Sequence, residues 1–96
     1  MDLEWDPAKA RANIKKHGVH FEEAARVFLD EYRIEIYDGD RRGAQGEDRW
    51  KTIGLVGPAL LVVVYTVRGA NNTVIRLISA RKADLHEKRQ YLQTNT

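Results

Sequence analysis

The feature that most constrains the fold of this sequence is the apolar run at residues 60–65, Leu-Leu-Val-Val-Val-Tyr. β-Branched and aromatic residues favour a strand here. Successive side chains of a strand point to opposite faces, so a strand that is apolar at every position needs cover on both sides. We therefore expect this run in the middle of a sheet, with helices supplying one of the covers.

Helical patterns precede the sheet. Asp6 followed by a proline at the first helical position is a strong helix start, and the helical spacing of small or apolar residues continues to His17. Gly18 ends that helix. A second helix is predicted from His20, an unusual N-cap residue, to residues 30–31.

Beyond residue 31 the hydrophobic pattern alternates, which indicates strands. Strands are predicted at 32–37, 49–55, 60–68 and 73–81, separated by a polar loop at 38–48 and by short turns. Simple alternation places Thr66 and Arg68 on the face of Val64, and it places Ser79 and Arg81 on the face of Leu77. Residues 83–92 form a closing helix, and 93–96 are expected to be a disordered tail.

These elements predict one α+β domain over residues 1–96. Two N-terminal helices are packed on one face of a four-stranded, mostly antiparallel sheet, and the C-terminal helix lies against its end. Residues 3–5 could form a short edge strand. The sequence contains neither an apolar run near the roughly 18 residues of a membrane span nor a basic-then-apolar leader, so we expect a soluble cytoplasmic protein.

The net charge of +2 conceals a strong polarity. Residues 1–48 hold eight Lys/Arg and twelve Asp/Glu, a balance of −4, whereas residues 49–96 hold eight and two, a balance of +6. Arginine outnumbers lysine in the second half, and its planar guanidinium binds phosphate or carboxylate through two parallel hydrogen bonds. The pattern favours an anionic partner; the alternative is that the two halves neutralise each other in the folded chain.

Several kinds of site are disfavoured by the residue inventory. The chain has no cysteine, which excludes disulfides and thiolate chemistry. Its histidines lack metal-ligand spacing, so we predict no metal and no cofactor. The glycines between residues 38 and 48 lie between two strands, unlike a phosphate-binding loop, and Ser79 lacks the glycine-flanked turn of a serine nucleophile.

Metal-free RNA cleavage fits the remaining side chains, because RNA supplies its own nucleophile in the 2′-hydroxyl. The protein must position the phosphate, stabilise the charge that develops on it and move two protons. The residues that could do this are Arg49, Tyr65, Arg68, Arg76, Arg81, Lys82 and Tyr91. The structural alternative is that the tyrosines belong to the core and that the arginines pair with carboxylates.

Several sequence blocks, which together span nearly the whole chain, resemble the BrnT family. They include Trp5-Asp6-Pro7, Lys16-His17-Gly18-Val19, Leu61-Val62-Val63-Val64-Tyr65-Thr66 and Ile78-Ser79-Ala80-Arg81. BrnT-like proteins are toxins of bacterial toxin–antitoxin pairs, similar in fold to the RelE ribonucleases. The resemblance implies a metal-independent endoribonuclease that arrests translation, and a BrnA-like, DNA-binding antitoxin that silences it and links it to operator DNA.

The resemblance also suggests site residues. RelE-type enzymes place basic residues on the central and last strands and often a tyrosine near the C-terminus, and Arg68, Arg81 and Tyr91 occupy comparable positions. His17, in the matching first-helix block, is the fourth candidate catalytic residue. The predicted RNA-binding residues are Arg49, Lys51, Arg76 and Lys82.

One alternative function remains open at this stage. The same cations would also suit a non-catalytic module that binds an acidic partner protein, because partner and RNA would compete for one basic surface.

Overall fold

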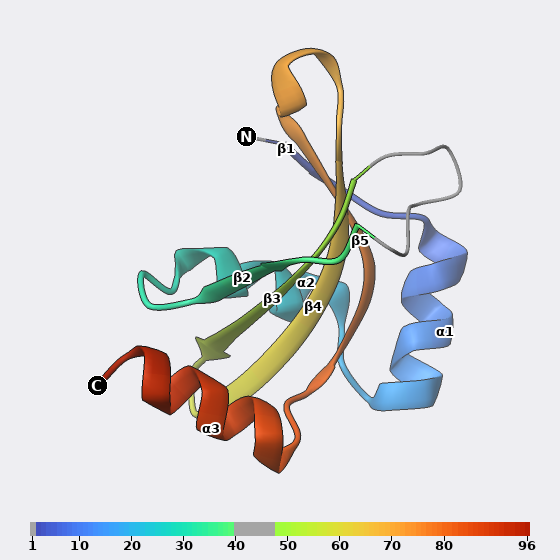
Figure 1. The fold of residues 1–96 in the computed structure, drawn as a ribbon. Coiled ribbons are helices and arrows are strands. Elements are labelled where there is room, and N and C mark those ends of the chain that lie inside the picture. The colour runs from blue at the N-terminus through green and yellow to red at the C-terminus, as the bar shows by residue number, and fades with distance from the viewer. Residues whose placement is uncertain (1, 40–47) are drawn as a thin grey trace.

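The structure is a computed structural model that describes residues 2–39 and 48–96. One sheet of five strands, in the order β1-β5-β4-β3-β2, has helices on both faces (Figure 1). The strands are β1 (Asp2–Glu4), β2 (Ile34–Tyr37), β3 (Arg49–Val56), β4 (Ala59–Arg68) and β5 (Val74–Lys82). The helices are α1 (Pro7–His17), α2 (Phe21–Ala24) and α3 (Leu85–Thr94), with 3₁₀ segments η1 (Ala25–Leu29) and η2 (Ala70–Asn72).

The predicted central strand is confirmed. β4 lies between β3 and β5 and is antiparallel to both. Leu61 and Val63 face the N-terminal helices, whereas Val62 faces α3, and all three are fully buried or nearly so. The run at 60–65 therefore has cover on both sides, as its composition requires.

The sheet has five strands, so the prediction of four was wrong. The additional strand is β1, which pairs in parallel with β5 through Leu3 opposite Ile75 and makes the sheet mixed. Three residues are too few to display an alternating pattern, which is why residues 3–5 gave only a weak signal.

The first helix begins and ends where predicted. The Asp6 carboxylate accepts a hydrogen bond from the Ala8 N–H at 2.9 Å, and Gly18 closes the helix with a left-handed φ of 71°.

The second helix is shorter than predicted. His20 occupies the N-cap position but makes no side-chain capping bond, and after one turn the chain tightens into η1. Without a cap, so short a helix depends on packing for its stability.

The C-terminal helix is displaced from its predicted limits of 83 and 92. Asp84 and Glu87 form a capping box, in which each side chain accepts a hydrogen bond from the other residue's backbone N–H, and this sets the start at Leu85. The helix continues to Thr94, so the predicted disordered tail includes its last turn. Asn95 then bonds to the Tyr32 and Tyr91 carbonyl oxygens.

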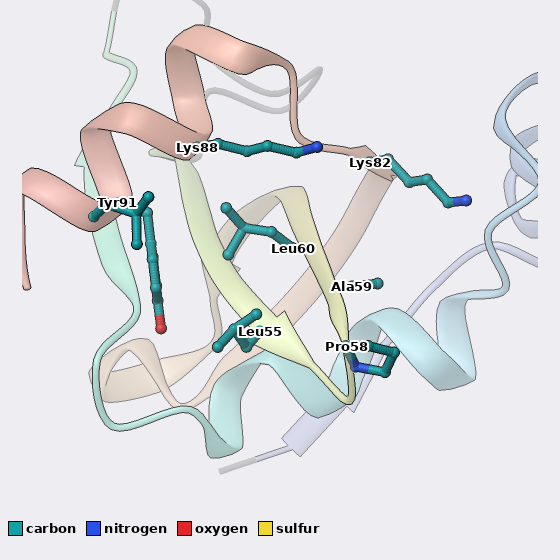
Figure 2. A pocket seen from close by; sticks show the side chains of 8 residues that line it. Leu55, Pro58, Ala59, Leu60, Lys82, Lys88 and Tyr91 are labelled. Atoms are coloured by element: carbon teal, nitrogen blue, oxygen red, sulfur yellow. The ribbon is translucent and has the colours of Figure 1, made fainter.

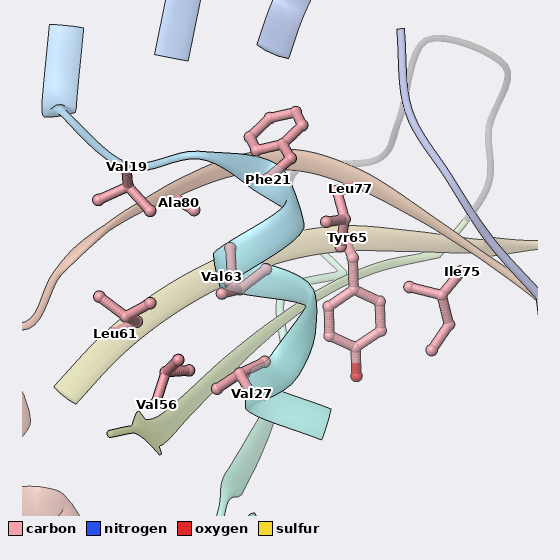
Figure 3. Packing of buried hydrophobic residues seen from close by; sticks show 11 residues of the cluster. Val19, Phe21, Val27, Val56, Leu61, Val63, Tyr65, Ile75, Leu77 and Ala80 are labelled. Carbon is pink, nitrogen blue, oxygen red and sulfur yellow. The ribbon is translucent and has the colours of Figure 1, made fainter. Parts of the chain in front are cut away.

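The main core fills the space between the sheet and the N-terminal helical segments (Figure 3). Phe21 and Val27 from the helical segments belong to one buried cluster with Leu61, Val63 and Leu77 from the strands. Gly54 permits the close approach of η1 to β3, since a Cβ atom there would lie 2.7 Å from the Val27 side chain. A smaller core lies under α3 on the opposite face.

The predicted polar loop at 38–48 falls largely at residues 40–47, outside the described residues. Within the described ranges, no helix has the length and apolar character needed to span a membrane.

Candidate functional site

Five predicted cationic residues project from one face of the sheet, which we call the basic face: Arg49, Lys51, Arg68, Arg76 and Arg81. Strand register explains their grouping. Arg49 lies opposite Thr66, which lies opposite Arg76, so these three form one row across β3, β4 and β5. Thr66 shares its face with Val62, which packs towards α3. The basic face is therefore the part of the α3 side that α3 leaves uncovered.

A bulge in β5 is required for this grouping. Val64 pairs with Ser79 and Tyr65 pairs with Leu77, which leaves Ile78 as an extra residue. The bulge restarts the alternation, so Ser79 and Arg81 lie on the face opposite Leu77 and the predicted assignment was wrong. Without it, Arg76 and Arg81 would project from opposite faces of the sheet.

The basic face is longer than a single phosphate contact. Arg68 is near the β4–β5 hairpin, whereas Arg81 lies opposite Val62, six residues further back along β4. At about 3.3 Å per residue, the two positions are about 20 Å apart. The two arginines predicted to be catalytic therefore lie at opposite ends of the basic face.

Carboxylates moderate the charge of the basic face. Glu4 lies between Arg68 and Arg76, with N–O distances of 3.4 and 3.6 Å, and Asp38 lies 3.6 Å from Arg49. Counting only residues 2–39 and 48–96, these two carboxylates and Glu87 oppose five cations and leave a balance of +2. The predicted pairing of arginines with carboxylates from the first half is thus present, but it does not neutralise the face.

Arg81 is held most firmly. Its two terminal nitrogens donate to the two oxygens of Glu87 at 2.7 and 2.8 Å. Hydrogen bonding from Arg81 lowers the pKa of the buried Glu87 to about 2, and the same bond raises the pKa of Arg81. Since Glu87 takes two of the five guanidinium N–H donors, Arg81 links β5 to α3 in this conformation.

The centre of the basic face contains unused hydrogen-bonding groups. The Thr66 hydroxyl and the Arg49 Nε are both buried and have no hydrogen-bond partner among the described residues, although the Asp38 carboxylate lies 3.6 Å from the Arg49 Nε. Thr66 is only 2% exposed and lies directly between Arg49 and Arg76. Both atoms are covered in this conformation, so they can donate to an oxyanion only after neighbouring side chains move.

Tyr91 is placed in the minor core instead of on the basic face. It packs with Ile53, Val62 and Ala83, and its hydroxyl donates to Asp30 at 2.7 Å. Burial, followed by the hydrogen bond to Asp30, raises its pKa to about 12. Tyr65, the other tyrosine considered for the site, is also buried in the main core. These positions match the structural alternative for both tyrosines.

Two further predicted residues lie off the basic face. Lys82 pairs with Leu61, whose side chain faces the N-terminal helices, so alternation directs Lys82 away from the arginines. His17 ends α1 and lines a hollow of about 260 Å³ along β5, together with Lys9, Lys16 and Ser79. His17 therefore adjoins the strand that carries Arg76 and Arg81, at its edge.

Sequence reasoning missed the residues that organise this region. Asn13, 5% exposed, donates to the carbonyl oxygens of Val19 and Ala80 and accepts from the Ala80 N–H, which fixes α1 to the edge of β5. Its amide among small and apolar helical positions was an available signal. Glu4 gave no comparable signal, because its pairing depends on strand order, and the Asp-x-x-Glu pattern marks Glu87 as a capping residue but not as the partner of Arg81. In residues 2–39 and 48–96, no three His, Asp or Glu side chains gather where they could hold a metal ion.

Comparisons with known proteins connect this geometry to a family. Residues 5–87 match the family described as "Ribonuclease toxin, BrnT, of type II toxin-antitoxin system". The fold matches the 1.1 Å crystal structure of the Brucella abortus ribonuclease toxin BrnT with a TM-score of 0.66 and 28% sequence identity, over 88% of this chain and 97% of that chain. A comparison with curated protein sequences gave no match. Because the family match spans most of the sequence, the chain belongs to the BrnT family of ribonuclease toxins of type II toxin–antitoxin systems.

Proposed function

We propose that the protein is an endoribonuclease that binds RNA on the basic face, cleaves it without a metal ion and thereby inhibits translation in the cytoplasm. The family supplies the reaction class. The observation that carries the proposal is the placement of Arg49 and Arg76, which lie on either side of Thr66 in one row across β3, β4 and β5 and project from the same face as three further cations.

The proposed chemistry needs no group beyond RNA and protein side chains. A base removes the proton of the 2′-hydroxyl, the 2′-oxygen bonds to the adjacent phosphorus, and the bond from phosphorus to the 5′-oxygen breaks. An acid protonates the departing 5′-oxygen, which leaves a 2′,3′-cyclic phosphate and a 5′-hydroxyl. The arginines stabilise the charge on the non-bridging oxygens as the phosphorus becomes pentacoordinate.

The length of the basic face suggests that different cations bind different phosphates of the RNA. Arg49 and Arg76 serve the scissile phosphate at the centre, while Arg68 and Arg81 hold flanking phosphates of the same strand. His17 is the proposed base or RNA contact from the edge of β5, and Lys51 is a further phosphate contact. Arg81 contributes fully only if its guanidinium exchanges Glu87 for a phosphate.

Purified protein incubated with single-stranded RNA in excess chelator tests the proposal. We expect cleavage products that end in a 2′,3′-cyclic phosphate, and losses of at least 100-fold in rate for Arg49→Ala and Arg76→Ala. Arg89→Ala is the matched control, since Arg89 is an exposed arginine of α3 outside the basic face. Activity that requires a divalent ion, or equal losses in all three variants, would reject the mechanism.

A non-catalytic binding module is the second candidate, favoured by the ion pairs that already engage the arginines. In this case the basic face binds an acidic protein and RNA remains intact in the same assay. Tight binding of the antitoxin with no RNA turnover would support this candidate instead.

The proposed partner is an antitoxin, as expected for a family of type II systems. We propose that it is BrnA-like and DNA-binding, and that it recruits the toxin to operator DNA. Co-purification of the toxin with the product of the neighbouring gene, followed by a gel-shift assay on the shared promoter, tests both points.

A further inference from the structure

An apolar hollow of about 530 Å³ lies between α3 and the β3–β4 turn (Figure 2). We call it the α3 groove. Its walls include Leu55 and Leu60 from the sheet, Pro58 from the β3–β4 turn and Leu92 from α3. Leu55 is 43% exposed and Leu92 is 60% exposed. Exposed aliphatic side chains that converge on one hollow are typical of a binding surface.

The apolar surface continues beyond the groove. Leu55 also lines a second hollow of about 210 Å³, in which Leu29 is 78% exposed. A strip from Leu92 through Leu55 to Leu29 therefore runs along this end of the molecule. This shape suits an elongated partner with several apolar side chains in a row.

The charges around the strip indicate the chemistry of the partner. Lys88 lies across the α3 groove from Leu55 and Pro58, Lys82 lines the groove but extends its ammonium group away from Leu60 (Figure 2), and Arg26 contributes to the second hollow. Within the part of the chain that the structure describes, no acidic residue lines the α3 groove. Asp30, which lines the second hollow, is already engaged by Tyr91 and by backbone N–H groups. The surface is complementary to a segment that is apolar on one side and acidic beside it.

The groove has the wrong architecture for an added strand. Among the described strands, the sheet edges are β1 and β2, whereas the groove is walled by side chains of α3 and of the β3–β4 turn. Side-chain grooves of this kind accept an amphipathic helix, which inserts residues spaced three or four apart.

The α3 helix separates this groove from the basic face. Lys88, Tyr91 and Leu92 face the groove, while Glu87 reaches Arg81 and Lys51 on the other side. A helix bound in the groove would therefore contact α3 without displacing any cation of the basic face.

We infer that the α3 groove is the docking site for an acidic amphipathic helix of the antitoxin. The inference depends on the two-component part of the proposed function and is independent of RNA cleavage. The chain is itself basic, with an isoelectric point of about 9.0, so an acidic protein partner also matches its overall charge.

The test uses the purified antitoxin encoded beside the toxin gene and isothermal titration calorimetry. We expect Leu92→Asp to weaken binding at least tenfold, because a charge replaces an apolar anchor. Leu85→Asp is the matched control, since Leu85 lies on the same helix with a similar exposed fraction, 62%, but outside the groove. Lys88→Glu should weaken binding by a smaller factor, and this factor should increase at low salt. Lys15→Glu on α1 should leave the affinity for the antitoxin unchanged.

The outcomes separate this inference from the proposed function. Loss of binding in Leu92→Asp alone supports the groove, whether or not the wild-type toxin cleaves RNA. Equal affinity of Leu92→Asp, Leu85→Asp and the wild type overturns it, as does an antitoxin that does not bind the wild type. Sedimentation of the toxin alone provides the remaining arm: a dimer that dissociates on Leu92→Asp would assign the groove to a second copy and reject the antitoxin as its occupant.

Discussion

The carboxylate of Glu87 accepts hydrogen bonds from two nitrogens of Arg81 and from the backbone N–H of Asp84. It therefore links β5, the start of α3 and the basic face. Folding lowers its pKa from 4.5 to about 2, so ionised Glu87 stabilises the folded state fully above pH 4.5 and loses this effect as the pH falls towards 2.

Glu87→Gln should lower the free energy of unfolding at pH 7 by about 2 kcal/mol, because Arg81 loses a nearly buried partner while remaining partly solvated itself. It should also remove part of the acid destabilisation between pH 4.5 and 2.5. Urea titrations of the variant and the wild type across that range measure both effects. Parallel pH profiles would show that another group is responsible.

Tyr91→Phe separates a structural tyrosine from a catalytic one. Removal of the hydroxyl takes one hydrogen bond from Asp30, which retains the N–H groups of Leu55 and Tyr32. We expect a loss of about 1 kcal/mol in stability, measured by denaturant titration, and a cleavage rate within twofold of the wild type. A 100-fold slower rate with an intact fold would instead identify Tyr91 as a general acid or base.

At the scale of elements, Asn13 fixes the position of α1. Asn13→Ala would leave the N–H and the carbonyl oxygen of Ala80 without their partner, in addition to the Val19 carbonyl oxygen. We expect a loss of about 2–4 kcal/mol in the free energy of unfolding. Lys15→Ala, an exposed substitution on the same helix, should change stability by less than about 0.5 kcal/mol. Equal effects of the two would show that α1 is held by apolar packing alone.

Elements with a local signal were predictable, and those that depend on distant partners were not. The limits of α1 follow from Asp6 and Gly18, and the central position of β4 follows from its composition. β1 is defined by its pairing with β5, and α2 changes to the 3₁₀ segment η1 after Ala24, although the helical sequence pattern continues. The capping box at Asp84 has a local signature in the sequence, Asp-x-x-Glu, which sets the start of α3 two residues after the predicted one.

At the scale of the whole molecule, five of the predicted cationic residues lie on one face of the sheet. Residue types identified the cations, but their common face depends on strand register and on the bulge at Ile78, neither of which one sequence fixes. Tyr91 and Lys82 were included by their proximity to the C-terminus and to Arg81 along the chain. Their positions in the core and beside the α3 groove follow from the tertiary structure.

The same distribution of charge predicts how RNA binding responds to salt. Each phosphate contact with single-stranded RNA contributes roughly 0.7 to the slope of log affinity against log salt concentration. Arg49→Gln and Arg76→Gln should each reduce that slope by about this amount, because both side chains project from the centre of the basic face. Fluorescence anisotropy with a 2′-O-methyl oligonucleotide, which cannot be cleaved, measures the slope between 50 and 200 mM KCl, concentrations that span the range where such contacts dominate. Arg89→Gln changes the net charge equally but lies outside the basic face, so an equal reduction in this control would mean that RNA binding follows overall charge and would reject the basic face as its site.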